Sequence, residues 1–245
     1  MGGRGSGSGI ARRRLRTEEP EQFDSFPDEA ETRTTYKGDG VEQEKWFDEN
    51  SNVDAIISQL SDDEIETFQG WARGNFMNGE QYKGWDNMRP IFREYTQTYD
   101  DVLDRSVITK GLSVVRLTTA EIFFGKGNRN ASLSDLQGLE GRTILSNGNL
   151  STAAASQGLT IGDSSKRHEI RINIPAGSKG AGMWIGDTRI NAWGNRQREF
   201  MMNRDILLKV GKTTYDSNRN VYITEVTYTG RTPHDYGKTG RIKFD

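Results

Sequence analysis

The sequence predicts an α+β fold in which helices come first and a largely antiparallel sheet follows. Residues 53–105 carry apolar side chains at helical spacing, whereas residues 110–228 hold short β-branched segments separated by turns rich in Gly, Asn and Ser. Helices and strands do not alternate, so a doubly wound parallel sheet is not expected. Of the 245 residues, 33% are apolar and 28 are glycine, a lean composition that still allows a packed core.

The helical half has clear start signals. Ser61 is followed three residues later by Glu64, which is the pattern of a capping box, and apolar residues then recur at helical spacing. Two further helical segments are predicted at residues 82–88 and 90–105, and the second opens with a proline, which suits a first helical turn. We therefore expect the first half of the core to be helical.

The second half contains short segments with the residue types of strands. In the segment that begins at His168, isoleucines at alternate positions share one face. The predicted strands are residues 112–119, 168–175, 198–202, 205–210 and 222–228.

Composition excludes several kinds of protein. The chain has no cysteine, which rules out disulfide scaffolds, thiolate metal sites and cysteine nucleophiles, and its two histidines, His168 and His234, lack the spacing of metal ligands. No apolar run is long enough for a membrane helix and no signal-peptide core is present, so we expect a soluble protein without a metal. The net charge of −2 argues against binding of nucleic acid over the whole surface.

Charge is unevenly spread along the first 50 residues. Residues 1–16 hold five arginines and no acid, whereas residues 17–50 hold twelve acidic residues against three basic ones. We expect residues 1–50 to form a flexible arm, basic and then acidic, before one domain at residues 51–245. The basic run could contact nucleic acid, membrane phosphates or an acidic partner, or simply pair with the acidic stretch that follows it.

Three short motifs follow one another in the second half. Arg116 ends the segment Leu-Ser-Val-Val-Arg, Ser151 begins Ser-Thr-Ala, and Gln197 and Glu199 frame Gln-Arg-Glu at the start of a predicted strand. In this order they resemble the signatures of mono-ADP-ribosyltransferases of the R-S-E class, related to clostridial Rho-modifying exoenzymes and binary-toxin enzymatic components. The resemblance covers about residues 53–211.

Two longer segments extend the resemblance. Residues 71–89 are similar to the helix before the arginine strand of these toxins, and residues 168–181 resemble their isoleucine-rich strand with its Pro-x-Gly-x-Lys-Gly turn. The sequence departs from the family at Ala153, which replaces the last residue of Ser-Thr-Ser, at Leu150, where an aromatic residue is usual, and at Leu117. The resemblance implies N-terminal helices packed on a mainly antiparallel core of two sheets.

The resemblance also implies an enzyme that uses NAD as a substrate and needs no metal. ADP-ribosyl transfer breaks the bond between nicotinamide and ribose through a transition state with oxocarbenium character. Arg116 would bind the pyrophosphate, Ser151 and Thr152 would contact the nucleotide, and Glu199 would stabilise the positive charge that develops on the ribose. Asn87 is expected near the nucleotide; a register shifted by one residue would place Asp86 there instead.

Gln197 indicates which kind of acceptor receives the ADP-ribose. On an extended strand, side chains two residues apart point the same way, which places the Gln197 amide beside the catalytic Glu199. In the family, Glu at this first position accompanies modification of arginine, whereas Gln accompanies other acceptors. We therefore expect a protein side chain other than arginine as the acceptor, with Trp193 in the preceding loop contacting it.

Several alternatives stay open. The same residues would serve a transferase that modifies DNA bases or a glycohydrolase that transfers ADP-ribose to water, and a virion protein could keep the fold without catalysis. Each residue also has an ordinary structural interpretation, such as an ion pair, a turn residue or a core anchor. The Gly- and Arg-rich start is similar to that of some phage-encoded proteins with such a domain, so we expect a protein that is cytoplasmic, carried on a virion or delivered into a host cell.

Overall fold

The computed structural model describes residues 43–73, 81, 85–125, 128–146, 148–154, 168–186, 190, 199–234 and 236. The helices are α1 (Gln43–Asn50), α2 (Val53–Ile57), α3 (Asp62–Arg73), the 3-10 turn η1 (Trp85–Asn87), α5 (Pro90–Asp104), α6 (Glu121–Phe124) and α7 (Leu133–Gln137). The strands are β1 (Leu112–Thr118), β2 (Thr143–Ser146), β3 (Leu150–Thr152), β4 (His168–Ile174), β5 (Gly182–Trp184), β6 (Phe200–Met202), β7 (Ile206–Asp216) and β8 (Val221–Arg231). No helix in these ranges is long and apolar enough to cross a membrane.

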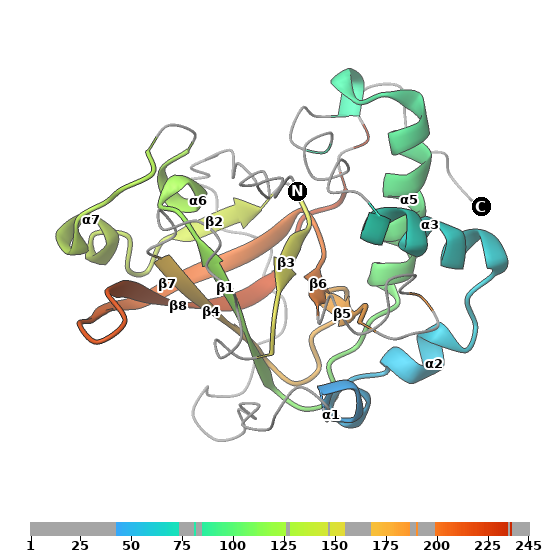
Figure 1. Cartoon of the computed structure of the whole chain (residues 1–245), viewed down its shortest axis with the longest axis horizontal. Coiled ribbons are helices and arrows are strands. Elements are labelled where there is room, and N and C mark those ends of the chain that lie inside the picture. Colours follow the sequence, from blue (N-terminus) through green and yellow to red (C-terminus); the bar gives the residue numbers. More distant parts are fainter. Residues whose placement is uncertain are drawn as a thin grey trace, which may run out of the picture.

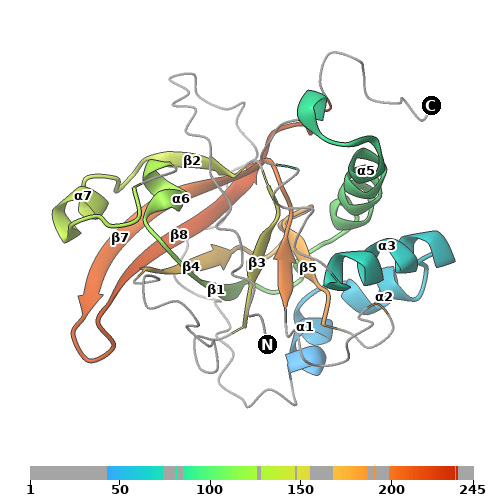
Figure 2. The same ribbon diagram turned by 45° about the horizontal axis from the view of Figure 1, so that its top comes forward.

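The helices form where local chemistry predicts them. The backbone N–H of Glu64 donates a hydrogen bond of 3.2 Å to the Ser61 hydroxyl, and the backbone N–H of Ser61 donates one of 2.8 Å to the Glu64 carboxylate, so the predicted capping box starts α3. Pro90 is the first residue of α5, as expected. Figures 1 and 2 show α1, α2, α3 and α5 gathered beside β5 and β6, whereas α6 and α7 lie at the far end beside β2.

Helix α1 lies within the range assigned to the arm. Its Phe47 is fully buried and stacks on Trp184 of β5 and Phe200 of β6, with ring centroids 4.7 and 5.2 Å apart. The folded part of the chain therefore includes residues from Gln43 onward, because these aromatic contacts anchor α1 to the small sheet. The rest of the expected arm lies outside the described residues.

The strands form two sheets, which confirms the predicted α+β class. The larger sheet has the order β1-β4-β8-β7-β2 and the smaller one the order β3-β6-β5. Every pair is antiparallel except β4 with β8, which run parallel. The two sheets meet where Val115 of β1 and Ala153, just after β3, exchange backbone hydrogen bonds of 2.7 and 2.8 Å.

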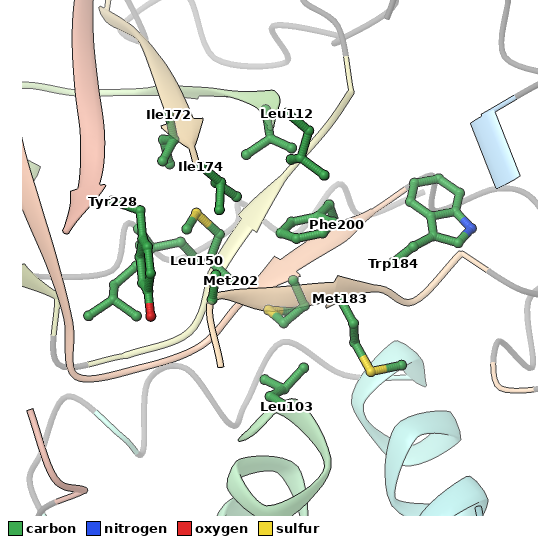
Figure 3. Packing of buried hydrophobic residues seen from close by; sticks show 14 of the residues in the cluster. Leu103, Leu112, Leu150, Ile172, Ile174, Met183, Trp184, Phe200, Met202 and Tyr228 are labelled. Carbon is green, nitrogen blue, oxygen red and sulfur yellow. The ribbon is translucent and has the colours of Figure 1, made fainter. Parts of the chain in front are cut away.

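The core lies between the two sheets and α5. Figure 3 shows Leu112, Ile172 and Ile174 of the large sheet on one side of Phe200 and Met202 of β6, with Leu103 of α5 on the other side. Strands β5 and β6 are buried along their whole length, because the large sheet covers one face and helices cover the other. Their sequences consequently lack the alternation of a half-exposed strand.

A buried cluster of charged residues joins α5 to the turn after β6. Arg204 binds Asp100 through contacts of 2.7 to 3.0 Å and Asp205 at 2.8 Å. Asp100 also accepts a hydrogen bond of 2.8 Å from Tyr236, and His234 contacts Asp205 at 3.1 Å. We call these residues, together with Asp104 and Arg231, the charge cluster. It fixes the end of β6 relative to α5.

Candidate active site

Strands β1, β3 and β6 bring three of the predicted site residues together. Arg116 lies on β1, Ser151 is the central residue of β3, and Glu199 directly precedes β6. β3 pairs with β6 so that Ser151 stands opposite Met201, and the Glu199 carbonyl accepts a backbone hydrogen bond of 2.9 Å from Ile185, just after β5. Residues that are distant in the sequence therefore meet at the junction of the two sheets.

Arg116 is held against β3. Its Nη1 donates a hydrogen bond of 2.6 Å to the carbonyl oxygen of Ser151, and the side chain is half-buried. β1 is an edge strand of the large sheet, so its free side faces the small sheet, where β3 lies. The guanidinium is thereby fixed next to the serine that also contacts Glu199.

Glu199 is a buried carboxylate, with 8% of its surface exposed. The Ser151 hydroxyl donates a hydrogen bond to it, and the charge of Arg116 acts on it. Burial raises the pKa of Glu199 above its ordinary range, and the Ser151 hydrogen bond and the Arg116 charge oppose this rise without cancelling it. Such a poorly hydrated carboxylate can stabilise positive charge that develops beside it.

Most of the chain matches one known protein family. Residues 49–230 match the family described as ADP-ribosyltransferase exoenzyme. The chain belongs to this family. The family comprises mono-ADP-ribosyltransferase toxins that use NAD. No curated protein matches the sequence.

Solved structures of ADP-ribosyltransferase toxins share the fold of this chain. Plx2a, an ADP-ribosyltransferase toxin from Paenibacillus larvae, has a TM-score of 0.67 at 18% identity, over 78% of this chain and 97% of that one. C3stau2 from S. aureus, solved with NAD, has a TM-score of 0.66 at 15% identity, over 82% and 100% of the two chains. BECa, an ADP-ribosylating toxin of C. perfringens solved with NADH, has a TM-score of 0.65 at 16% identity, over 80% and 50%.

Helix α5 carries a buried phenol, Tyr99, that interacts electrostatically with Glu199. Tyr99 is fully buried and packs on Phe68 of α3, with ring centroids 4.2 Å apart. Burial raises the pKa of the Tyr99 phenol well above its ordinary range, and the negative charge of Glu199 raises it further. No motif marked Tyr99, because its helical spacing is the same as that of a residue that only fills the core.

Two other predicted residues, Thr152 and Asn87, differ in their local surroundings. Thr152 is buried, and its hydroxyl donates a hydrogen bond of 2.7 Å to the carbonyl of Phe200. This bond joins β3 to β6, so the Thr152 hydroxyl serves the strand pairing, and its contact with NAD stays a prediction. Asn87 is an exposed residue at the end of η1, and its role toward the nucleotide is likewise untested.

The predicted acceptor residues Gln197 and Trp193 lie outside the described residues. The residues that can be described supply a guanidinium, a hydroxyl and a carboxylate, which suit binding of phosphate and stabilisation of an oxocarbenium ion. Within the described ranges, no group of three or more acidic or histidine side chains could hold a metal ion.

Proposed function

We propose that the protein is a mono-ADP-ribosyltransferase that transfers ADP-ribose from NAD to a macromolecular acceptor and releases nicotinamide. The observation that carries this proposal is the contact of Ser151 with both partners: its hydroxyl binds Glu199 and its carbonyl binds Arg116. One residue of β3 thus orients a carboxylate and a cation together. Membership of the ADP-ribosyltransferase exoenzyme family supports the same reaction.

Glu199 is the catalytic carboxylate in this proposal. As the bond from ribose C1 to the nicotinamide nitrogen lengthens, its electron pair leaves with nicotinamide, and positive charge develops on C1 and the ring oxygen. An ionised Glu199 would stabilise that charge and hold a ribose hydroxyl. The effect is strong in a buried site, because little water screens the carboxylate.

Arg116 supplies the anion-binding group. A guanidinium has five N–H donors in a fixed plane, which suits bidentate contact with phosphate oxygens. One donor of Arg116 binds the Ser151 carbonyl, which fixes the plane of the group relative to β3. The pyrophosphate of NAD would then be bound at a set distance from Glu199, and the scissile bond would be oriented.

The acceptor is expected to be a protein side chain other than arginine, and Gln197 supports this part of the proposal. A glutamine amide can donate and accept hydrogen bonds with a neutral acceptor, whereas it offers no negative charge to a guanidinium. Trp193 would contact the acceptor beside it. Transfer to a nucleic acid and transfer to water are the outcomes that the experiment must separate.

The test is incubation with NAD labelled in the ADP-ribose moiety and a cell lysate, for wild type and Glu199→Gln. Glu140→Gln is the matched control, because Glu140 is exposed and lies away from the site in the turn after α7. We expect a labelled band that protease removes, that nuclease leaves and that Glu199→Gln abolishes. A label removed by nuclease, nicotinamide release without label, or no turnover of NAD would each contradict the proposal.

A further inference from the structure

Two buried amides lie next to the site and contact each other reciprocally. The side chain of Gln81 donates a hydrogen bond of 2.6 Å from Nε2 to Oδ1 of Asn149. In return, the backbone N–H of Asn149 donates one of 3.0 Å to Oε1 of Gln81. The side chain of Asn149 also donates a hydrogen bond of 3.1 Å from Nδ2 to the carbonyl of Met202. We call Gln81 and Asn149 the amide clamp.

The amide clamp joins three parts of the chain. Gln81 belongs to the helical half, Asn149 directly precedes β3, and Met202 is the last residue of β6. Only 5% of Gln81 and 1% of Asn149 are exposed, so their polar atoms would be costly to bury without these partners. The clamp therefore favours one placement of the start of β3 against β6.

This placement affects the contact between Ser151 and Glu199. Ser151 lies on β3 and Glu199 lies directly before β6, so their hydrogen bond depends on how the two strands are aligned. β3 has three residues, and a strand this short fixes its own register weakly. The bridge between Val115 and Ala153 holds the end of β3, and the clamp holds its start.

We infer that Gln81 and Asn149 are positioning residues, which hold β3 so that the Ser151 hydroxyl meets the Glu199 carboxylate. The inference rests on the proposed function for the meaning of that contact, although the contact itself can be measured without turnover. Neither amide needs to touch NAD. Their effect on the reaction would pass through Ser151. A positioning role can therefore be distinguished from a general structural role, because it should disappear when Ser151 is replaced.

The test uses Gln81→Met, which keeps the side-chain length but removes both the donor and the acceptor of the Gln81 amide. The substitution is compared in wild type and in a Ser151→Ala background. The first readout is the pKa of Glu199, followed by carbon-13 NMR of its side-chain carboxyl. The second is kcat and KM for release of nicotinamide from NAD. The matched control is Thr213→Val, which breaks another buried pair, with hydroxyls 2.9 Å apart, in the hairpin of β7 and β8.

We expect Gln81→Met to raise the pKa of Glu199 and to lower kcat about tenfold, because it weakens a hydrogen bond to a charged group, with KM for NAD unchanged. In the Ser151→Ala background the same substitution should alter neither quantity further. Thr213→Val should leave both at wild-type values. If Gln81→Met does not fold, Asn149→Leu provides the second variant, since it removes the donor to Met202 and the acceptor for Gln81 without adding a charge, and it predicts the same direction.

An unchanged pKa of Glu199 in both clamp variants would overturn the inference, and so would an equal effect with and without Ser151. Failure of the proposed function looks different. In that case wild type releases no nicotinamide, while the NMR titration still reports whether the clamp controls the contact between Ser151 and Glu199.

Discussion

Removal of Arg204 should destabilise the protein strongly. Its side chain is 6% exposed and lies between Asp100 and Asp205, which are 0% and 7% exposed. Burial raises the pKa of Asp100 above its ordinary range even though Arg204 opposes the rise. In Arg204→Met, Asp100 would keep the Tyr236 hydrogen bond but lose its main positive partner.

The expected loss follows from that burial. Breaking a buried ion pair from one side costs about 3–5 kcal/mol, because the remaining charge is left uncompensated. For a domain of this size, 1 kcal/mol corresponds to about 2–4 °C, so the melting temperature should fall by about 6–20 °C. The assay is thermal unfolding followed by circular dichroism at pH 7, with urea unfolding to obtain the free energy.

Two controls isolate the cause. Arg105→Met removes the partner of Glu64 at a more exposed ion pair, where a loss of less than about 1 kcal/mol is expected. The double variant Arg204→Met with Asp100→Asn also removes the negative charge that Arg204 would have compensated, and it should recover part of the lost free energy of unfolding. A loss below about 1 kcal/mol in Arg204→Met, or no recovery in the double variant, would refute the reasoning.

Three further predictions concern the site and its surroundings. Ser151→Ala should raise the pKa of Glu199, so the acid limb of the pH profile for nicotinamide release should move to higher pH; an unmoved limb would show that Ser151 does not support the carboxylate. Burial lowers the pKa of His234, but hydrogen bonds to Asp104 and Asp205 outweigh this and hold it above its ordinary value. The stability that His234 contributes is then complete below about pH 6.5 and lost as pH rises through the raised pKa. Unfolding at pH 6 and pH 9 should show a larger decline in wild type than in His234→Gln, and equal declines would contradict this. Gln197→Glu should shift transfer toward arginine, measured as labelling of a free guanidino compound, and a variant that still ignores guanidinium would argue against Gln197 as an acceptor contact.

Elements with local causes could be predicted from the sequence. The capping box of Ser61 and Glu64 and the first-turn position of Pro90 act within a few residues, and α3 and α5 begin where these signals place them. The five predicted strands correspond to β1, β4, β6, β7 and β8, because their runs of β-branched and large apolar residues differ clearly from the turns between them.

Strand β5 could not be predicted, because its cause lies elsewhere in the chain. It has three residues, all buried, and opens with Gly182 at φ 144°. A Cβ atom at Gly182 would lie 2.2 Å from the carbonyl oxygen of Met201, so the close approach of β6 requires glycine there. In the sequence this glycine looks the same as one in a turn. The parallel pairing of β4 with β8 likewise depends on the path of the chain between them.

The residues of the site likewise divide into those that sequence motifs reveal and those that only the fold reveals. Arg116, Ser151 and Glu199 belong to motifs, and the structure brings all three together. Gln81 and Asn149 belong to no motif, because their roles come from a contact across 68 positions in the sequence. A buried polar pair of this kind becomes visible only when the fold shows which groups must satisfy each other.

The central claim is that Glu199 stabilises the charge that develops as nicotinamide leaves. It is tested most directly by the rate of nicotinamide release from NAD in Glu199→Gln, which keeps the shape of the side chain and removes its charge. The account predicts a fall in kcat of about 100-fold or more, with Glu140→Gln at the wild-type rate. Release by Glu199→Gln at the wild-type rate, in a variant that folds normally, would contradict it.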